Sequence, residues 1–155
     1  MLAEYVLRHG LTARLPRLRA ALLGSEGVTQ GQRQRIERAF QTRAYSWYGH
    51  SERVVLAGEC EQTGAYHHFP DYGILEIVDD QGNPCNREGE RGEIVGTGLY
   101  NRCMPLIRYR TGDYATRLAP RCPCGRAWDR FTEVEGRWKQ DMVFGRKGRE
   151  FRSPP

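Results

Sequence analysis

Residues 104–113 read MPLIRYRTGD, an apolar run that continues directly into two arginines, a turn dipeptide and a carboxylate. The stretch from Leu106 to Tyr109 is typical of a β-strand, and Thr111-Gly112 is typical of a strand end. We therefore expect Asp113 just beyond a strand terminus, where ligand-binding groups usually stand in sheet proteins. A carboxylate there can accept hydrogen bonds from a vicinal diol, such as that of a ribose. The alternative is a turn or helix-capping Asp paired with Arg110.

The size and composition of the chain indicate one soluble domain or less. It has 155 residues, of which 39% are hydrophobic and 28% charged, as in ordinary globular proteins. No apolar run approaches the roughly 20 residues that cross a bilayer. The N-terminus lacks the basic start and apolar middle of a secretion signal, so we expect a cytoplasmic protein without a membrane partner.

The net charge of +5 raises the question whether the chain binds nucleic acid. The cations are nearly all arginine, with Lys139 and Lys147 as the two lysines, and they alternate with acidic residues except at 146–149. This distribution favours a solvated surface over a nucleic-acid-binding face. The alternative function is a zinc-stabilised basic module that touches nucleic acid or an acidic partner through Arg146, Lys147 and Arg149.

The pattern along the chain predicts an α/β protein with two successive parts. Residues 2–9 and 30–40 favour helices, the second with Thr29 as N-cap. Residues 18–23 and 44–48 favour strands, and this strand–helix–strand order is typical of a parallel sheet. After residue 53 the pattern changes to short strands separated by turns, as in an antiparallel meander or small barrel. These candidates lie at 54–57, 66–69, 73–78, 92–97, 106–110 and 114–118, with another at 142–144.

The segment 45–52, YSWYGHSE, carries a second set of candidate ligand contacts. Tyr48 offers a flat ring to a purine, and Gly49 allows a ligand to approach the backbone. Glu52 supplies the carboxylate oxygen that Mg²⁺ prefers. The alternative is an aromatic core strand followed by a helix-capping Glu. A hydrolytic pair of His50 and Ser51 is disfavoured, because adjacent strand residues point to opposite faces and no nucleophile elbow is present.

The cysteines predict a metal centre rather than disulfides. Their number, five, is odd, and the chain has no secretion signal. Three of them and an upstream histidine have the composition of a closed tetrahedral zinc site: Cys60, His67, Cys122 and Cys124. Because the Cys-x-Cys spacing is tighter than usual, free thiols in a loop are the alternative. Cys85 and Cys103 belong to no motif.

Taken together, these stretches resemble the adenylate-forming (AMP-producing) ligase superfamily. The most similar branch is the phenylacetate–coenzyme A ligase-like family, including its relatives in capsular polysaccharide biosynthesis. The resemblance runs in one order from Leu18 to Arg149. It rests on Gly24-Ser25-Glu26, Trp47 to Glu52, Glu59-Cys60, Tyr66-His67, Gly89 to Val95, Arg108 to Asp113, Cys122 to Arg126 and Gly136-Arg137.

The resemblance implies part of the large domain of such an enzyme. We expect an α/β portion at 1–53, a β-rich, barrel-like subdomain at 54–135, and a hinge with the start of a C-terminal domain at 136–155. The resemblance also implies ATP, Mg²⁺, coenzyme A and a carboxylic acid as ligands, and zinc in some relatives. Its implied nucleotide contacts are Gly24, Ser25, Glu26, Tyr48, Gly49, Asp113 and Arg137, with Glu52 on magnesium and Cys60, His67, Cys122 and Cys124 on zinc.

The departures from the family pattern also carry expectations. The resemblance places a Ser/Thr/Gly-rich phosphate loop upstream of Leu18 and a C-terminal domain with a catalytic Lys after Arg137, and we expect this chain to lack both. Ser51 replaces a common Thr, and the segment 136–141 is longer than the family's usual hinge motif, so Asp141 is not assigned as the hinge residue. We therefore expect a fragment that binds ATP or AMP weakly and does not complete catalysis alone. It would be a truncated gene, a piece of a split enzyme whose partner is the N-terminal half, or a non-functional remnant.

Overall fold

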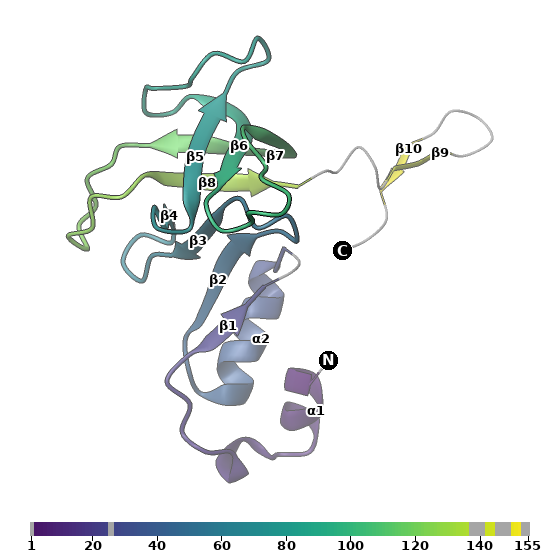
Figure 1. Ribbon diagram of the computed structural model, residues 1–155. Helices are drawn as coiled ribbons and strands as arrows, with labels where there is room; N and C mark the ends of the chain where they lie inside the picture. The colour runs from purple at the N-terminus through teal and green to yellow at the C-terminus, as the bar shows by residue number, and fades with distance from the viewer. Residues whose placement is uncertain (1, 25–26, 137–141, 145–149, 153–155) are drawn as a thin grey trace.

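The structure is a computed structural model that describes residues 2–24, 27–136, 142–144 and 150–152 (Figure 1). It contains two α-helices, α1 (Leu2–Arg8) and α2 (Gln30–Phe40), and a short 3₁₀ turn at Thr12–Arg14. The strands are β1 (Ala21–Leu23), β2 (Ala44–Gly49), β3 (Leu56–Glu59), β4 (Tyr66–His68), β5 (Gly73–Val78), β6 (Arg91–Gly98), β7 (Tyr109–Leu118), β8 (Arg130–Glu135), β9 (Met142–Phe144) and β10 (Glu150–Arg152).

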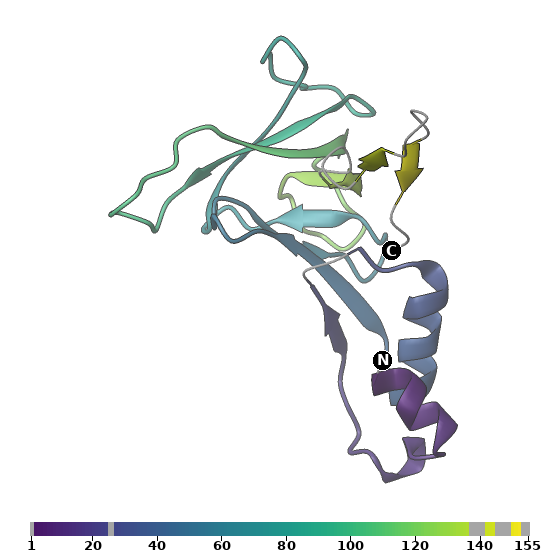
Figure 2. The same cartoon turned by 90° about the vertical axis from the view of Figure 1, so that its right-hand side faces the viewer.

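Helix α2 forms where its sequence predicts it. Thr29 accepts a hydrogen bond from the backbone N–H of Gln32, and the Gln32 side chain accepts one from the backbone N–H of Thr29. This reciprocal capping box satisfies donors that the first helical turn leaves without partners. Ala39 of α2 is buried against Ala3 and Val6 of α1. The two helices therefore form a small core of their own beside the first strands (Figure 2).

Strands β1 and β2 pair in parallel, with Ala21 opposite Ala44. Helix α2 connects them, as parallel strands require a crossover. The side chain of Arg33 on α2 holds this arrangement, since its guanidinium donates to the Ala44 carbonyl at 2.7 Å and to Glu59 at 2.7 Å. The parallel α/β beginning of the chain is thereby confirmed.

Strand β2 continues into an antiparallel sheet with the order β1-β2-β3-β4-β8-β7-β6-β5. The sheet is open, so the barrel-like subdomain that the sequence suggested is not closed among the described residues. Strands β2 and β3 pair antiparallel across residue 53, so hydrogen bonding continues over the predicted boundary there. The division of the chain at residues 53 and 135 remains a prediction.

The sheet curls around one hydrophobic core. Side chains from β3, β5, β6, β7 and β8 meet in it, although β3 and β5 lie far apart in the strand order. The backbone of β5 also approaches the segment before β3 closely, because a Cβ on Gly73 would lie 2.0 Å from the Val54 carbonyl oxygen. This curvature brings side chains of β2 within reach of β7.

The strand predictions differ from the structure in one divided strand and in two strands that were missed. Residues 106–110 and 114–118 do not form two strands, because β7 runs without interruption from Tyr109 to Leu118. Asp113 therefore lies inside a strand rather than beyond its end. Strands β8 and β10 were not predicted. In β8, Glu133 has a φ of 53°, and this left-handed residue disturbs the alternation that marks a strand.

No helix of the described residues is long and apolar enough to cross a membrane.

Candidate functional site

Tyr48 and Asp113 meet although 65 residues separate them. The Tyr48 hydroxyl donates a hydrogen bond of 2.8 Å to Oδ2 of Asp113. Tyr48 comes from β2 and Asp113 from β7, with three other strands between them in the sheet order. Asp113 is 9% exposed. The predicted pair of an aromatic ring and a carboxylate is therefore present at one place, which is the arrangement that a common ligand would need.

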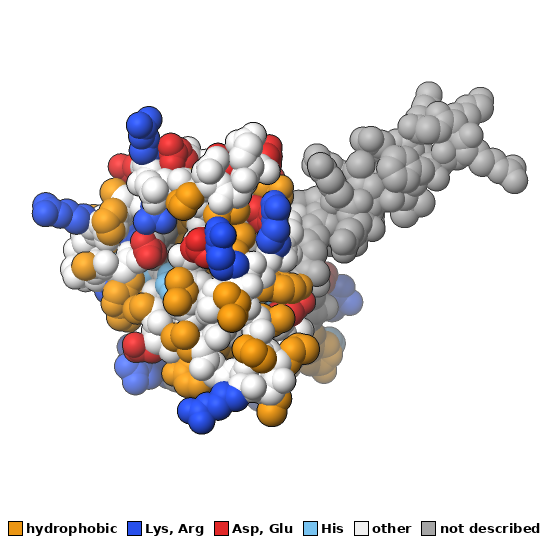
Figure 3. All heavy atoms as spheres, turned by 45° about the horizontal axis from the view of Figure 1, so that its top comes forward, with side chains coloured by type: hydrophobic (Ala, Val, Ile, Leu, Met, Phe, Trp, Pro, Cys, Tyr) orange, Lys and Arg blue, Asp and Glu red, His pale blue; other side chains and the backbone are white. Residues whose placement is uncertain are grey.

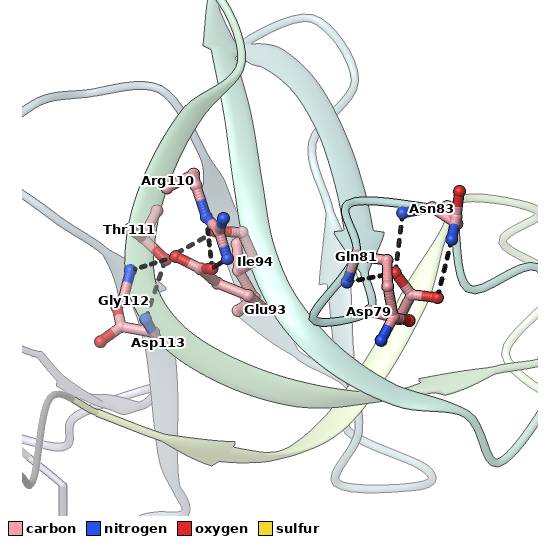
Figure 4. Close-up of polar contacts among 9 residues, drawn as sticks. All are labelled: Asp79, Gln81, Asn83, Glu93, Ile94, Arg110, Thr111, Gly112 and Asp113. Carbon is pink, nitrogen blue, oxygen red and sulfur yellow. Dashed lines mark hydrogen bonds and ion pairs between the residues drawn. The ribbon is translucent and has the colours of Figure 1, made fainter.

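An irregularity in β7 determines where Asp113 lies. Between the paired positions Val95↔Arg110 and Glu93↔Tyr114, residues 111–113 stand opposite Ile94 alone. This is a bulge, which bends a strand and redirects its side chains. The Thr111 hydroxyl donates to the Ile94 carbonyl at 2.8 Å and accepts from the Asp113 backbone N–H at 3.1 Å (Figure 4).

Glu52 belongs to the same group of side chains. It accepts a hydrogen bond from the Tyr109 hydroxyl at 3.0 Å, and its other oxygen lies 3.6 Å from Nδ1 of His50. The His50 ring lies edge-on to that of Tyr48, with centroids 5.9 Å apart. Because Tyr48 also contacts Asp113, the candidate magnesium ligand and the candidate ribose ligand are connected through one aromatic cluster.

Sequence reasoning did not assign Tyr109 to the site. Its ring lies 6.4 Å from that of His50, centroid to centroid, and its hydroxyl reaches Glu52. The sequence feature that could have identified Tyr109 is its position in the RYRTGD run, four residues before Asp113. His50 contacts Glu52 and the two tyrosine rings, and this packing gives a structural reason for a histidine at that position.

The glycines of the predicted site pack against Trp47. A Cβ on Gly24 would lie 2.1 Å from the indole nitrogen of Trp47, and one on Gly49 would lie 2.7 Å from its ring. Any larger residue at either position would displace the ring. Of the remaining predicted contacts, Ser25, Glu26 and Arg137 lie outside the described residues, as does Asp141.

The chain leaving β8 passes close to Asp113. A Cβ on Gly136 would lie 3.7 Å from Oδ1 of Asp113. The residue that follows, Arg137, is the predicted nucleotide contact at the hinge. Gly136, the last described residue before it, thus lies beside the predicted ribose contact.

The four predicted zinc ligands come together. One ligand atom from each of Cys60, His67, Cys122 and Cys124 lies within 4.8 Å of the others. The Cys60 and Cys122 sulfur atoms are 3.8 Å apart, and the Cys124 sulfur lies 3.4 Å from Nε2 of His67. Cys60 directly follows β3 and His67 lies in β4, and the loop between β7 and β8 supplies the Cys-x-Cys pair.

The electrostatics of this cluster favour thiolates. Burial acts to raise the pKa of the Cys60 thiol, but hydrogen bonds with the Thr63 side chain, the backbone and His67 outweigh it and bring the pKa to about 5. The pKa of Cys122 is also lowered, since hydrogen bonds with Cys124 and Thr63 outweigh its desolvation. Thiolate sulfur and neutral imidazole are the ligand types of structural zinc. Cys85 and Cys103 lie outside the cluster.

Comparisons with known proteins identify the relationship. No protein-family model matches the chain. A phenylacetate-coenzyme A ligase of Thermus thermophilus is 34% identical over 146 residues, which are 92% of this chain and 32% of that protein. The Escherichia coli protein of the same name is 36% identical over 129 residues, 81% of this chain and 29% of its own length. The chain is homologous to about a third of the length of the phenylacetate-coenzyme A ligases.

A solved structure supports the same assignment. A 2-hydroxyisobutyryl-CoA ligase in complex with R3-HIB-AMP superimposes with a TM-score of 0.75 and 26% identity, over 97% of this chain and 33% of that one. This phenylacetate-coenzyme A ligase-like chain thus spans about a third of the length of the relatives it matches. The predicted superfamily and fold are confirmed, and the placement in a capsular polysaccharide branch remains a prediction.

The basic segment of the alternative function, residues 146–149, lies outside the described residues. On the face of the ligase-like chain that Figure 3 shows, Lys and Arg side chains are scattered among acidic and apolar ones rather than gathered in one patch. That face does not have the continuous positive surface typical of nucleic-acid binding.

Proposed function

We propose that this chain forms the nucleotide-binding part of an AMP-forming acyl-CoA ligase. The observation that supports the proposal most directly is the contact between Tyr48 and Asp113 across the curled sheet. The Tyr48 ring would pack against adenine, and the Asp113 carboxylate would accept hydrogen bonds from the ribose hydroxyls. A carboxylate suits this task because it only accepts hydrogen bonds, whereas both hydroxyls of the diol can donate.

Glu52 would hold Mg²⁺. It provides hard carboxylate oxygen, the ligand type that Mg²⁺ takes, and Tyr109 and His50 already orient it. A magnesium ion there would neutralise charge on the nucleotide phosphates. The protein's own contribution is to fix the carboxylate within the aromatic cluster that also holds Tyr48.

In the whole enzyme, the carboxylate of the acid substrate would attack the α-phosphate of ATP and release pyrophosphate. The acyl-adenylate would then pass its acyl group to the thiol of coenzyme A. The chain described here supplies candidates for adenine, ribose and magnesium contacts.

The Cys60, His67, Cys122 and Cys124 cluster would bind a structural zinc ion. All four ligands are protein side chains, as in closed structural sites. The ion would tie the loop between β7 and β8 to the end of β3 and to β4, so its role would be to stabilise the sheet rather than to react.

Titration with AMP tests the nucleotide site. We expect Asp113→Ala to weaken AMP binding about 10- to 100-fold, because hydrogen bonds to a charged group contribute roughly 1.5–3 kcal/mol. Isothermal titration calorimetry with wild type and variant measures this. Asp71→Ala, which removes an exposed carboxylate elsewhere in the chain, serves as the control. Binding that the Asp113 substitution leaves undiminished would contradict the proposal.

A further inference from the structure

Glu93 on β6 is a buried carboxylate without a role in the proposed function. The residue is 5% exposed. Its Oε2 accepts a hydrogen bond of 2.7 Å from Nε of Arg110 and a second from Nη2 of the same guanidinium. Its Oε1 accepts the backbone N–H of Gly112 at 3.0 Å. A buried carboxylate is costly unless it is fully paired, and these partners satisfy both of its oxygens.

The position of Glu93 coincides with the bulge that places Asp113. Glu93 and Tyr114 are the last regular pair before the three residues of β7 that stand opposite Ile94. Gly112, in the middle of the three, has a φ of 76°, a left-handed conformation that glycine adopts without strain. The Glu93 side chain therefore spans the place where the regular pairing of β6 and β7 is interrupted (Figure 4).

The two residues that precede Asp113 are both hydrogen-bonded to β6. The Glu93 carboxylate accepts a hydrogen bond from the N–H of Gly112, and the Ile94 carbonyl accepts one from the hydroxyl of Thr111. That hydroxyl in turn accepts from the backbone N–H of Asp113. The bulge thus has two anchors, and the Glu93 carboxylate is the charged one.

We propose that Glu93 is a positioning residue, which fixes the bulge so that the Asp113 carboxylate faces Tyr48 and can bind a ribose diol. The inference rests on the proposed function, because it assumes that Asp113 contacts the sugar. In this proposal Glu93 does not contact the sugar. Its effect passes through the backbone of Gly112, and it should therefore act on the recognition of the sugar hydroxyls.

The experiment compares binding of AMP and 2′-deoxy-AMP by isothermal titration calorimetry. The two ligands differ by one hydroxyl of the diol, so the ratio of their dissociation constants measures how strongly the site prefers ribose to 2′-deoxyribose. We expect wild type to prefer AMP about tenfold or more, which is one charge-assisted hydrogen bond. Glu93→Ala should reduce this preference below about threefold, while Glu93→Gln should retain most of it because its amide oxygen can still accept from Gly112.

Glu76→Ala is the matched control. Glu76 lies on the neighbouring strand β5 and pairs with Nε of Arg108 at 3.0 Å, so the substitution removes a similar ion pair without touching the bulge. It should leave the preference unchanged. If Glu93→Ala does not fold, Glu93→Asp tests the proposal in its place. This variant keeps the charge but withdraws the carboxylate from Gly112 by one methylene, and it too should lower the preference for AMP.

The outcomes separate the two proposals. A folded Glu93→Ala or Glu93→Asp protein that keeps the wild-type preference would overturn the positioning role and leave the proposed function intact. A wild-type protein that binds both nucleotides equally would overturn the assignment of Asp113 to the ribose, and the role of Glu93 with it.

Discussion

Asp79 closes the turn between β5 and β6 through its own carboxylate. Oδ1 accepts the backbone N–H groups of Asn83 at 2.8 Å and Gln81 at 3.0 Å, and Oδ2 accepts from the Asn83 side chain at 3.2 Å (Figure 4). The hydrogen bond from the Asn83 backbone, followed by the others, holds the pKa of Asp79 below its usual range. At this scale, one residue and its neighbours in sequence determine the local structure.

The lowered pKa of Asp79 makes its contribution to stability depend on pH. A carboxyl whose pKa is lower in the folded chain stabilises it fully above the unfolded pKa of about 3.9 and loses that effect as pH falls through the folded value. We therefore expect the difference in Tm between wild type and Asp79→Ala to shrink from pH 6 to pH 2.5. Thermal unfolding measures it, with Asp80→Ala as control. A difference that is constant over this range would refute the prediction.

Elements differ in how far their own sequence determines them. Helix α2 begins at the predicted cap and ends at the predicted residue, because its stabilising contacts lie within a few positions of the chain. Strand β7 was divided in two at Thr111-Gly112, because the sequence cannot show that Glu93 and Ile94 of a neighbouring strand hold this dipeptide in the middle of a strand. The difference lies in the sequence distance between the interacting groups.

The capping box of α2 gives a prediction at the scale of the helix. Thr29→Ala should lower the free energy of unfolding by about 1 kcal/mol, since it removes the acceptor for the Gln32 N–H. Urea denaturation measures the change. Thr29→Ser keeps the hydroxyl and should restore nearly all of the lost stability; a Ser variant as unstable as the Ala variant would show that the cap is not responsible.

Strand β8 gives a second prediction at this scale. The Phe131 side chain is fully buried; its ring stacks on that of Tyr66 at 5.6 Å between centroids and lies edge-on to Tyr48 at 5.8 Å. Phe131→Ala should cost about 3–5 kcal/mol of unfolding free energy. Urea denaturation monitored by circular dichroism measures the loss, and Phe131→Leu should lose less. A loss below about 1 kcal/mol would contradict the packing described here.

At the scale of the whole molecule, the Cys/His cluster ties segments that are far apart in the chain. We expect the purified protein to contain about one zinc ion per chain, and chelation to lower its Tm by at least about 5 °C, because 1 kcal/mol shifts Tm by roughly 2–4 °C in a chain of this size. Elemental analysis and thermal unfolding test this. Cys122→Ala should abolish metal binding and Cys103→Ala should not. Protein that takes up no zinc on refolding would contradict the proposed zinc site.

The sequence by itself determined what depends on neighbouring residues: both helices, the parallel start, most strands, and the residue types for a diol, a magnesium ion and a zinc ion. These follow from periodicity, caps and spacing, which act over a few positions. Its motifs also determined the relationship to the phenylacetate-coenzyme A ligases, because they occur in the order of that family. The role of each residue remains a prediction.

Only the tertiary structure decided which of these residues meet. The open sheet curls so that β2 and β7 approach each other across three intervening strands, and this brings Tyr48 to Asp113. In the bulge before Asp113, the backbone N–H of Gly112 donates to the carboxylate of Glu93 on another strand. Strand order, curvature and bulges arise from contacts between segments tens of residues apart, and no local pattern in one sequence records such contacts.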